Sequence, residues 1–211
     1  MKIGGFVKQS LIDYPGKIAS IIFTMGCNFR CGYCHNPQLV LPGLFHSNQL
    51  IKEEEIFRYL EERKSWLEGG VVTGGEPTIH QNLPDFLKQI KEIGYKVKLD
   101  TNGSNPEMIK LLLANKLVDY IAMDIKTVLI SEKYLKIIGL PNKGSIVESI
   151  ISSILIIKNA SIDYEFRTTS IPGLHTQQTL EEISGYFTDG DSYIVNEFRE
   201  GDTVSSSCLY E

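Results

Sequence analysis

Short apolar runs alternate with amphipathic helical patterns along most of this 211-residue chain. Six runs rich in β-branched residues are typical of strands, at residues 18–24, 69–75, 95–101, 118–126, 162–171 and 192–198. Strands that alternate with helices in this way predict a parallel sheet covered by helices. The sequence therefore predicts an α/β fold, either an incomplete (β/α)6 parallel barrel or a doubly wound sheet, with ligands at the carboxyl ends of the strands.

Capping signals mark the boundaries of the helices between these runs. One helix is expected to begin after an N-cap at Asn82 and to end at Gly94. Another is expected to begin after an N-cap at Asn105, with Pro106 as its first residue. Two more begin with predicted capping boxes, formed by Ser145 with Glu148 and by Thr179 with Glu182. A further amphipathic helix is expected over residues 47–67, with Ile56, Phe57, Leu60 and Leu67 on its apolar side.

Composition narrows the classes of function. The chain carries 21 Lys and Arg against 26 Asp and Glu, a net charge of −5, and no long basic run, so nucleic acid is not an expected partner. The first residues lack a secretory pattern, and no apolar run is long enough for a membrane span, so we expect a cytoplasmic protein with no membrane partner. We expect one domain over residues 1–211, with a core at about 17–198 and a tail at 199–211.

Three of the four cysteines lie close together in the stretch GCNFRCGYCHN. Cys27, Cys31 and Cys34 have the spacing C-x3-C-x2-C and directly follow the first predicted strand. The loop therefore belongs to the edge of the sheet where ligands are expected. In a cytoplasmic protein, clustered cysteines indicate metal or redox chemistry more often than disulfides.

Four kinds of site match this spacing. Covalent haem attachment matches Cys31, Cys34 and His35 as C-x-x-C-H, but it normally occurs in exported proteins. Zinc would need the adjacent Cys34 and His35 to reach one tetrahedral ion. A dithiol of Cys31 and Cys34 leaves Cys27 without a role. An iron–sulfur cluster held by three thiolates keeps one iron open for a substrate or cofactor.

The spacing, with the aromatic Tyr33 just before the third cysteine, resembles that of the radical S-adenosylmethionine enzymes. The resemblance implies that Cys27, Cys31 and Cys34 hold a catalytic [4Fe-4S] cluster, and that the chain has the incomplete barrel of that family's core. It also implies that the open iron binds the amino and carboxylate groups of S-adenosylmethionine. An electron from the cluster would then cleave this cofactor to a 5′-deoxyadenosyl radical.

Segments at the ends of other predicted strands extend the resemblance. They are Thr73-Gly74-Gly75-Glu76-Pro77, Leu99-Asp100-Thr101-Asn102-Gly103, Met123-Asp124-Ile125-Lys126 and EFRTTSIPG at residues 165–173. The last three look like the DTNG, D-x-K and R-T-φ-φ-P-G segments of the activases of glycyl radical enzymes. The implied cofactor-binding residues are Tyr33, Gly74, Gly75, Glu76, Asp100, Asn102, Asp124, Lys126, Arg167 and His175.

The resemblance assigns a role to several of these side chains. The Glu76 carboxylate suits the ammonium group of the cofactor. Asp100 and Asp124 lie near the cofactor and can hold a monovalent cation beside it. Lys126 is a polar contact in the pocket. Arg167 pairs with a carboxylate of the cofactor or of a peptide substrate, and the histidine that follows it approaches the ribose.

The opening SLIDYPGK at residues 10–17 and CHNP at residues 34–37 resemble the anaerobic ribonucleoside-triphosphate reductase activating proteins. The resemblance, which covers residues 3 to about 175, implies a glycyl radical enzyme as protein substrate and flavodoxin or ferredoxin as electron donor. The alternatives are activation of a pyruvate formate-lyase-like enzyme, a small-molecule radical enzyme such as a carboxy-deazaguanine synthase, and a ferredoxin-like electron carrier. Cys208, near the end of the chain, has no assigned role.

Overall fold

Seven strands of the described chain form one sheet, and their spatial order follows their order in the sequence. The computed structural model describes residues 1–45, 50–141 and 144–204. The strands are β1 (Ile3–Ser10), β2 (Ala19–Thr24), β3 (Gly69–Gly74), β4 (Lys96–Thr101), β5 (Tyr120–Asp124), β6 (Asp163–Ser170) and β7 (Tyr193–Glu197). β1 is antiparallel to β2, and every later neighbouring pair is parallel.

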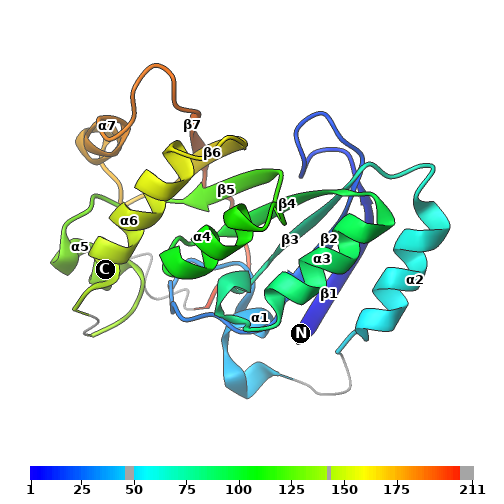
Figure 1. Cartoon of the computed structure of the whole chain (residues 1–211). Coiled ribbons are helices and arrows are strands. Elements are labelled where there is room, and N and C mark those ends of the chain that lie inside the picture. Colours follow the sequence, from blue (N-terminus) through cyan, green and yellow to red (C-terminus); the bar gives the residue numbers. More distant parts are fainter. Residues whose placement is uncertain (46–49, 142–143, 205–211) are drawn as a thin grey trace.

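The connections between the parallel strands carry the helices. They are α1 (Pro37–Val40), α2 (Glu53–Arg63), α3 (Leu83–Ile93), α4 (Pro106–Ala114), α5 (Ser131–Ile137), α6 (Ile146–Lys158) and α7 (Gln177–Ser184), with short 3-10 turns at Pro42–Leu44 and Pro77–Ile79. Helices α3, α4 and α6 lie across the face of the sheet that is turned toward the viewer in Figure 1. No helix in the described part of the chain is both long and apolar enough to cross a bilayer.

β1 is a strand that the sequence patterns do not predict. Its sequence, IGGFVKQS, contains two glycines, which weaken a strand signal, and its ladder depends on β2 as a neighbour. Among the described strands, β1 pairs only with β2 and β7 pairs only with β6, so the sheet is open. The predicted α/β fold with an incomplete parallel (β/α)6 barrel is confirmed, and β1 adds an antiparallel edge to it.

Two of the predicted helix boundaries have the expected geometry. Gly94 follows α3 with a φ of +112°, and its N–H donates to the carbonyls of Ile90 and Lys91. At the start of α4, the Asn105 side chain accepts a hydrogen bond of 3.2 Å from the N–H of Met108.

Asn82 and Ser145 are the N-cap residues of α3 and α6, as predicted, but neither side chain makes a capping hydrogen bond. The predicted capping box at Thr179 is wrong. Thr179 lies inside α7 and does not begin it. Thr176 is the N-cap instead, because its hydroxyl accepts the N–H of Thr179 at 3.1 Å. Two threonines three residues apart both fit a cap, and only the structure distinguishes them.

The helix predicted over residues 47–67 is α2, which spans Glu53–Arg63 alone. The helix begins later than predicted, because the backbone of Lys52, the residue before it, is extended. Residues 47–49 of the predicted helix lie outside the described ranges. Ile56 and Leu60 on its apolar side are fully buried, as the periodicity indicates.

The two faces of the sheet are packed differently. The main core joins apolar residues of α2, α3, α4 and α6 to strand residues such as Val97 and Leu99. A smaller cluster of Tyr14, Ala19, Ile21 and Val71 is separate from it. Because successive strand residues point to opposite faces, Lys98 lies on the face opposite Val97 and Leu99. The face without the main core therefore carries polar side chains of β4.

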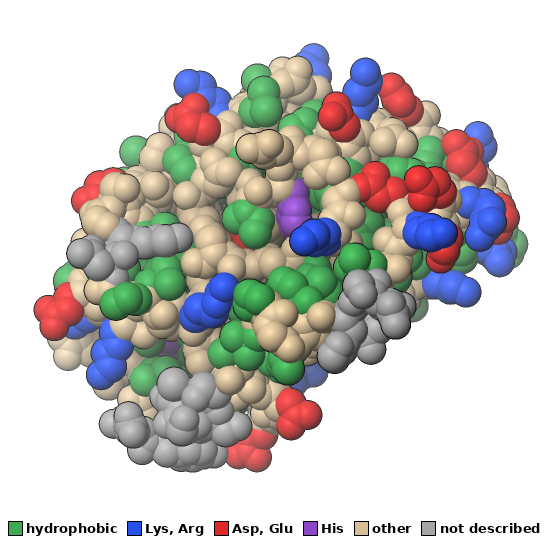
Figure 2. All heavy atoms as spheres, turned by 90° about the horizontal axis from the view of Figure 1, so that it is seen from below, with side chains coloured by type: hydrophobic (Ala, Val, Ile, Leu, Met, Phe, Trp, Pro, Cys, Tyr) green, Lys and Arg blue, Asp and Glu red, His purple; other side chains and the backbone are tan. Residues whose placement is uncertain are grey.

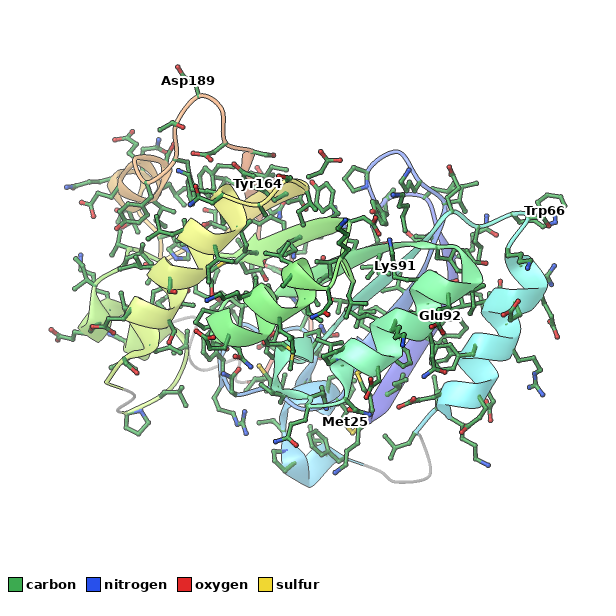
Figure 3. All side chains as sticks on the ribbon, viewed as in Figure 1. Met25, Trp66, Lys91, Glu92, Tyr164 and Asp189 are labelled. Carbon is green, nitrogen blue, oxygen red and sulfur yellow. The ribbon has the colours of Figure 1, made fainter. Side chains whose placement is uncertain are left out.

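The carboxyl end of β2 lies at the lower edge of the sheet in Figures 1 and 3. Met25, which follows β2, lies at this edge, whereas Trp66, which precedes β3, lies toward the opposite edge (Figure 3). The pairing of β2 with β3 runs from Ala19 with Gly69 to Thr24 with Gly74, so the two strands end together. The segments that the sequence singles out all follow strands at this edge.

Candidate active site

A cavity of about 240 Å³ opens at the carboxyl edge of the parallel strands. The predicted site residues that line it are Cys27, Cys31, Tyr33, Cys34, Gly74, Gly75, Glu76, Asp100, Asn102, Asp124, Lys126 and Arg167. They come from the loop after β2 and from β3, β4, β5 and β6 or the residues that follow them. Figure 2 shows the molecule from this edge, where hydrophobic side chains gather around the middle of the face.

The cysteine loop presents three free thiols to this cavity. Burial raises the pKa of Cys27 to about 12 and also raises the pKa of Cys31 and of the neighbouring phenol of Tyr33. A bound metal ion opposes this effect of burial at Cys27 and Cys31, because the cation stabilises the thiolate. The donor set therefore fits an iron–sulfur cluster, whose protein ligands are thiolates.

The amino-terminal half of the loop is held by contacts with distant segments. Gly26 N donates to the carbonyl of Leu39 at 2.7 Å, and Arg30 N donates to the carbonyl of Ile138 at 2.7 Å. The Arg30 side chain donates to the carbonyl of Cys27 at 2.6 Å. These contacts give the loop a defined path although it contains no helix or strand.

The two glycines at the end of β3 let that strand approach the cysteine loop. Gly74 has a φ of +117°, a backbone conformation in which a residue with a side chain would be strained. A Cβ atom on Gly75 would collide with the carbonyl of Gly26. Close contact also brings Glu76 N within 2.8 Å of that same carbonyl, to which it donates a hydrogen bond. The glycine pair thus sets the distance between β3 and the first cysteine.

The Glu76 carboxylate is buried and accepts four hydrogen bonds from the protein. Oε1 accepts from Thr78 N at 3.0 Å, from the Thr78 hydroxyl at 2.5 Å and from the Thr101 hydroxyl at 2.7 Å. Oε2 accepts from Asn102 N at 2.7 Å. Burial raises the pKa of Glu76, and these hydrogen bonds oppose that effect. The carboxylate therefore joins the end of β3 to the end of β4.

Asn102 joins the end of β4 to the cysteine loop. Its Nδ2 donates to Asn28 Oδ1 at 3.0 Å, and Asn28 Nδ2 donates to the hydroxyl of Ser104 at 2.8 Å. Ser104 N in turn donates to Asn102 Oδ1 at 2.9 Å, which closes the network. Asn28 and Ser104 support the cavity residue Asn102 through these bonds, and the sequence analysis does not identify them.

Four predicted residues form one ion network across β4, β5 and β6. Arg167 Nε lies 3.0 Å from Asp124 Oδ1, and its NH2 lies 3.6 Å from Asp100 Oδ2. Lys126 Nζ lies 2.9 Å from Asp124 Oδ2. Burial raises the pKa of Asp124, but Lys126 and Arg167 outweigh it and lower this pKa to about 2. Asp124 raises the pKa of Lys126 and of Arg167 in turn, so these three groups are charged at neutral pH.

Lys98 and Glu165 complete this network, and the sequence analysis misses both. Lys98 is 3% exposed, and its Nζ lies 3.3 Å from Asp100 Oδ1 and 3.6 Å from Glu165 Oε1. Strand periodicity is the signal that could have identified them, because each lies two residues before a predicted site residue and so shares its face.

The network contains three cationic and three anionic side chains, so its charges balance. Asp100 and Asp124 each contact cationic side chains of the protein, at the place where the sequence predicts a monovalent cation. That cation stays a prediction.

His175 is the one predicted site residue that does not line the cavity. Its Nδ1 accepts the N–H of Ile171 at 3.1 Å, and its Nε2 donates to the carbonyl of Lys126 at 2.9 Å. Burial lowers the pKa of His175, consistent with a neutral ring. In this arrangement the imidazole connects the segment after β6 to the segment after β5, and both nitrogens are engaged with the main chain.

Comparison with known proteins identifies the relatives of this chain. The profile of the Radical SAM superfamily matches residues 21–186. A protein of Methanocaldococcus jannaschii named as a glycyl-radical enzyme activating enzyme is 34% identical over 202 residues, which are 95% of this chain and 81% of that protein. The pyruvate formate-lyase-activating enzyme of Clostridium pasteurianum is 33% identical over 132 residues, 60% of this chain and 53% of that enzyme.

Solved structures share the fold at low sequence identity. SuiB of Streptococcus suis superposes with a TM-score of 0.67 at 16% identity, over 88% of this chain and 40% of SuiB. Native anSMEcpe with bound AdoMet superposes with a TM-score of 0.60 at 15% identity, over 84% of this chain and 50% of that protein. This chain thus spans half or less of the length of these two structures.

Proposed function

Because this chain belongs to the radical SAM superfamily and, within it, to the enzymes that activate glycyl radical enzymes, we propose that it acts on a backbone glycine of an anaerobic ribonucleoside-triphosphate reductase. The enzyme removes one hydrogen atom from that glycine and leaves a glycyl radical on the partner. The observation that carries the proposal is the convergence of three free thiols and the GGEP, DTNG, D-x-K and arginine segments on one cavity.

The superfamily uses a [4Fe-4S] cluster and S-adenosylmethionine, and the donor set fits them. Cys27, Cys31 and Cys34 would hold three irons and leave the fourth open for the cofactor. When bound, the reduced cluster supplies the electron that cleaves S-adenosylmethionine to methionine and a 5′-deoxyadenosyl radical.

The remaining side chains of the cavity bind and orient. Arg167 and Lys126 present cationic groups from two strand ends, which suits the carboxylate of the cofactor. Gly74 and Gly75 let β3 lie close to β2 and to the cysteine loop, and so place their own main chain in the cavity wall. Glu76 acts through the main chain that it holds in place, since its carboxylate oxygens already accept protein donors.

The choice of partner rests on the opening at residues 10–17 and on CHNP at residues 34–37. The similarity to pyruvate formate-lyase-activating enzymes supports a pyruvate formate-lyase-like enzyme as a second candidate partner. A low-potential donor such as flavodoxin or ferredoxin would reduce the cluster. Reduced thiols and such a donor suit the cytoplasm, where we place the enzyme.

Anaerobic EPR of the reconstituted, reduced protein tests the cofactor chemistry. A [4Fe-4S]⁺ signal that changes when S-adenosylmethionine is added supports an open iron, and a signal indifferent to the cofactor contradicts it. Cys27→Ala, Cys31→Ala and Cys34→Ala should each lose the signal. Cys208→Ala, a residue outside the described ranges, should keep it and serves as the matched control.

The partner is tested by incubating the reduced protein and S-adenosylmethionine with each candidate glycyl radical enzyme. A glycyl radical signal on the ribonucleotide reductase but not on the pyruvate formate-lyase-like protein is the expected result. The reverse pattern would assign the second candidate. Cleavage of the cofactor without a radical on either protein would favour a small-molecule substrate.

A further inference from the structure

The chain that follows β7 returns to the cysteine loop. Phe198 N donates to the carbonyl of Ser170 at 3.1 Å and so extends the pairing of β7 with β6. Six residues later, Val204 N donates to the carbonyl of Cys34 at 3.0 Å. Residues 198–204, which we call the clasp, thus connect the last strand of the sheet to the loop that follows the first parallel strand. The part of the predicted tail that is described here is therefore packed against the site.

The clasp also holds His35. The imidazole stacks on the Phe198 ring with centroids 4.9 Å apart and an angle of 25° between the planes. Its Nε2 lies 2.7 Å from the carbonyl oxygen of Arg199. Because a carbonyl can only accept, Nε2 carries the proton and donates. A Cβ on Gly201 would lie 3.5 Å from His35 Cδ2, so the clasp backbone also passes beside the ring.

The two halves of the cysteine loop are therefore anchored by different parts of the fold. The half with Cys27 is bonded to Leu39 and Ile138, as described above. Among the described residues, the one long-range backbone hydrogen bond of residues 31–36 is the bond from Val204 N to Cys34. The position of the third cysteine therefore depends on the clasp to an extent that the position of Cys27 does not.

We propose that the clasp and His35 form a positioning device that fixes Cys34 in the cavity wall, so that residues 198–204 complete the cluster site. His35, which reads in the sequence as a candidate metal ligand, acts through its contacts with Phe198 and Arg199. Its imidazole donates to a main-chain carbonyl, and Cys34 is held from the same segment. The cluster part of this inference rests on the proposed function, whereas the placement of Cys34 does not.

The first test needs no cluster. The metal-free, reduced protein is alkylated, and the rate at each cysteine is followed by peptide mass spectrometry. Val204→Pro removes the N–H that donates to Cys34, and Val204→Ala keeps it as the matched control. We expect Val204→Pro to increase the alkylation rate of Cys34 about fivefold, as expected for loss of one hydrogen bond, with Cys27 unchanged. Equal Cys34 rates in the two variants would overturn the proposal.

The second test measures how long the cluster is retained. Reconstituted protein is challenged with an iron chelator under anaerobic conditions, and loss of the visible absorbance is timed. Val204→Pro and His35→Ala should lose iron faster than Val204→Ala. His35→Gln keeps an N–H donor and should recover slow release. Release at one common rate in all variants would contradict the proposal.

The two results separate this inference from the proposed function. If the wild-type protein assembles no cluster, the proposed function fails, and the alkylation rates still decide whether the clasp positions Cys34. Thermal unfolding of each metal-free variant establishes that the proteins compared are folded.

His35→Phe keeps the stacking on Phe198 and loses the hydrogen bond, so it provides a second perturbation if Val204→Pro does not fold. Unaltered Cys34 reactivity in His35→Phe would then overturn the proposal.

Discussion

Arg167 on β6 reaches the end of β5, where its Nε donates to Asp124 Oδ1 at 3.0 Å. The same guanidinium lies 3.6 Å from Asp100 at the end of β4. One side chain thus connects the ends of three adjacent strands at the edge of the sheet where the cavity opens. Its planar group of donors suits this arrangement better than a lysine ammonium does.

A double-mutant cycle on Arg167 and Asp124 measures this connection. Arg167→Met should lower the free energy of unfolding by about 2 kcal/mol, because it leaves carboxylates partly unpaired. Adding Asp124→Asn should recover part of that loss, and urea denaturation of the metal-free protein gives the coupling. Lys88→Met is the control, since its ion pair with Glu92 is exposed at 3.9 Å and should contribute little. Strictly additive effects of the two site substitutions would contradict the connection.

Acid should weaken the same network within a defined pH range. The pKa of Asp124 is about 2 in the folded protein, below the value of about 3.9 for a free aspartate. A depressed folded-state pKa contributes stability above the unfolded-state value, and that contribution is lost as pH falls from about 4 toward about 2. The unfolding free energy of the wild type should therefore fall more steeply over this range than that of Asp124→Asn. Parallel curves for the two proteins would mean that Asp124 is not stabilised in this way.

Glu76 should behave as a structural residue as well as a site residue. Glu76→Ala leaves four buried donors without an acceptor, and we expect a loss of about 3 kcal/mol in the metal-free protein. Glu76→Gln should also destabilise, because an amide NH2 cannot accept from a donor. Cluster content and cofactor affinity should fall together. Weaker cofactor binding with unchanged stability would instead indicate direct contact between Glu76 and the cofactor.

The control for Glu76 is Glu92→Gln on α3, an exposed carboxylate that is labelled in Figure 3. Glu92→Gln changes a carboxylate to an amide, as Glu76→Gln does, but it leaves no buried hydrogen-bond donor without an acceptor. We expect its unfolding free energy to remain within about 0.5 kcal/mol of the wild type.

Gly75→Ala should prevent the cysteine loop from taking its position. The added methyl group would collide with the carbonyl of Gly26, which belongs to backbone and cannot rotate away. We expect loss of iron incorporation, measured as iron per protein after reconstitution. Gly144→Ala is the matched control, because a Cβ there meets nothing within 4 Å. Normal iron incorporation in Gly75→Ala would show that the contact can relax.

Several parts of the fold follow from local patterns. The six parallel strands and the helix boundaries at Gly94 and Asn105 are predictable because apolar periodicity and capping residues act over a few residues. Parallel strands end at one edge, so the order of the segments already predicts that Cys27, Glu76, Asp124 and the other motif residues meet there.

Other parts are decided by partners far away in the sequence. β1 is a strand because β2 pairs with it, and the Glu76 carboxylate is occupied because Thr101 and Asn102 come to it from the next strand. Lys98 belongs to the ion network through the alternation of its strand, which the cysteine and glycine motifs do not show.

The sequence alone therefore determined the order of the six parallel strands, the spacing of the three cysteines and the edge at which the site forms. These features depend on periodicity and on short segments that fold with their immediate neighbours. Only the tertiary structure decided which atoms meet at that edge, including the contact of Val204 with Cys34 across 170 positions of sequence. The physical reason is that hydrogen bonds and ion pairs are short-ranged in space, whereas the residues that make them are separated along the chain.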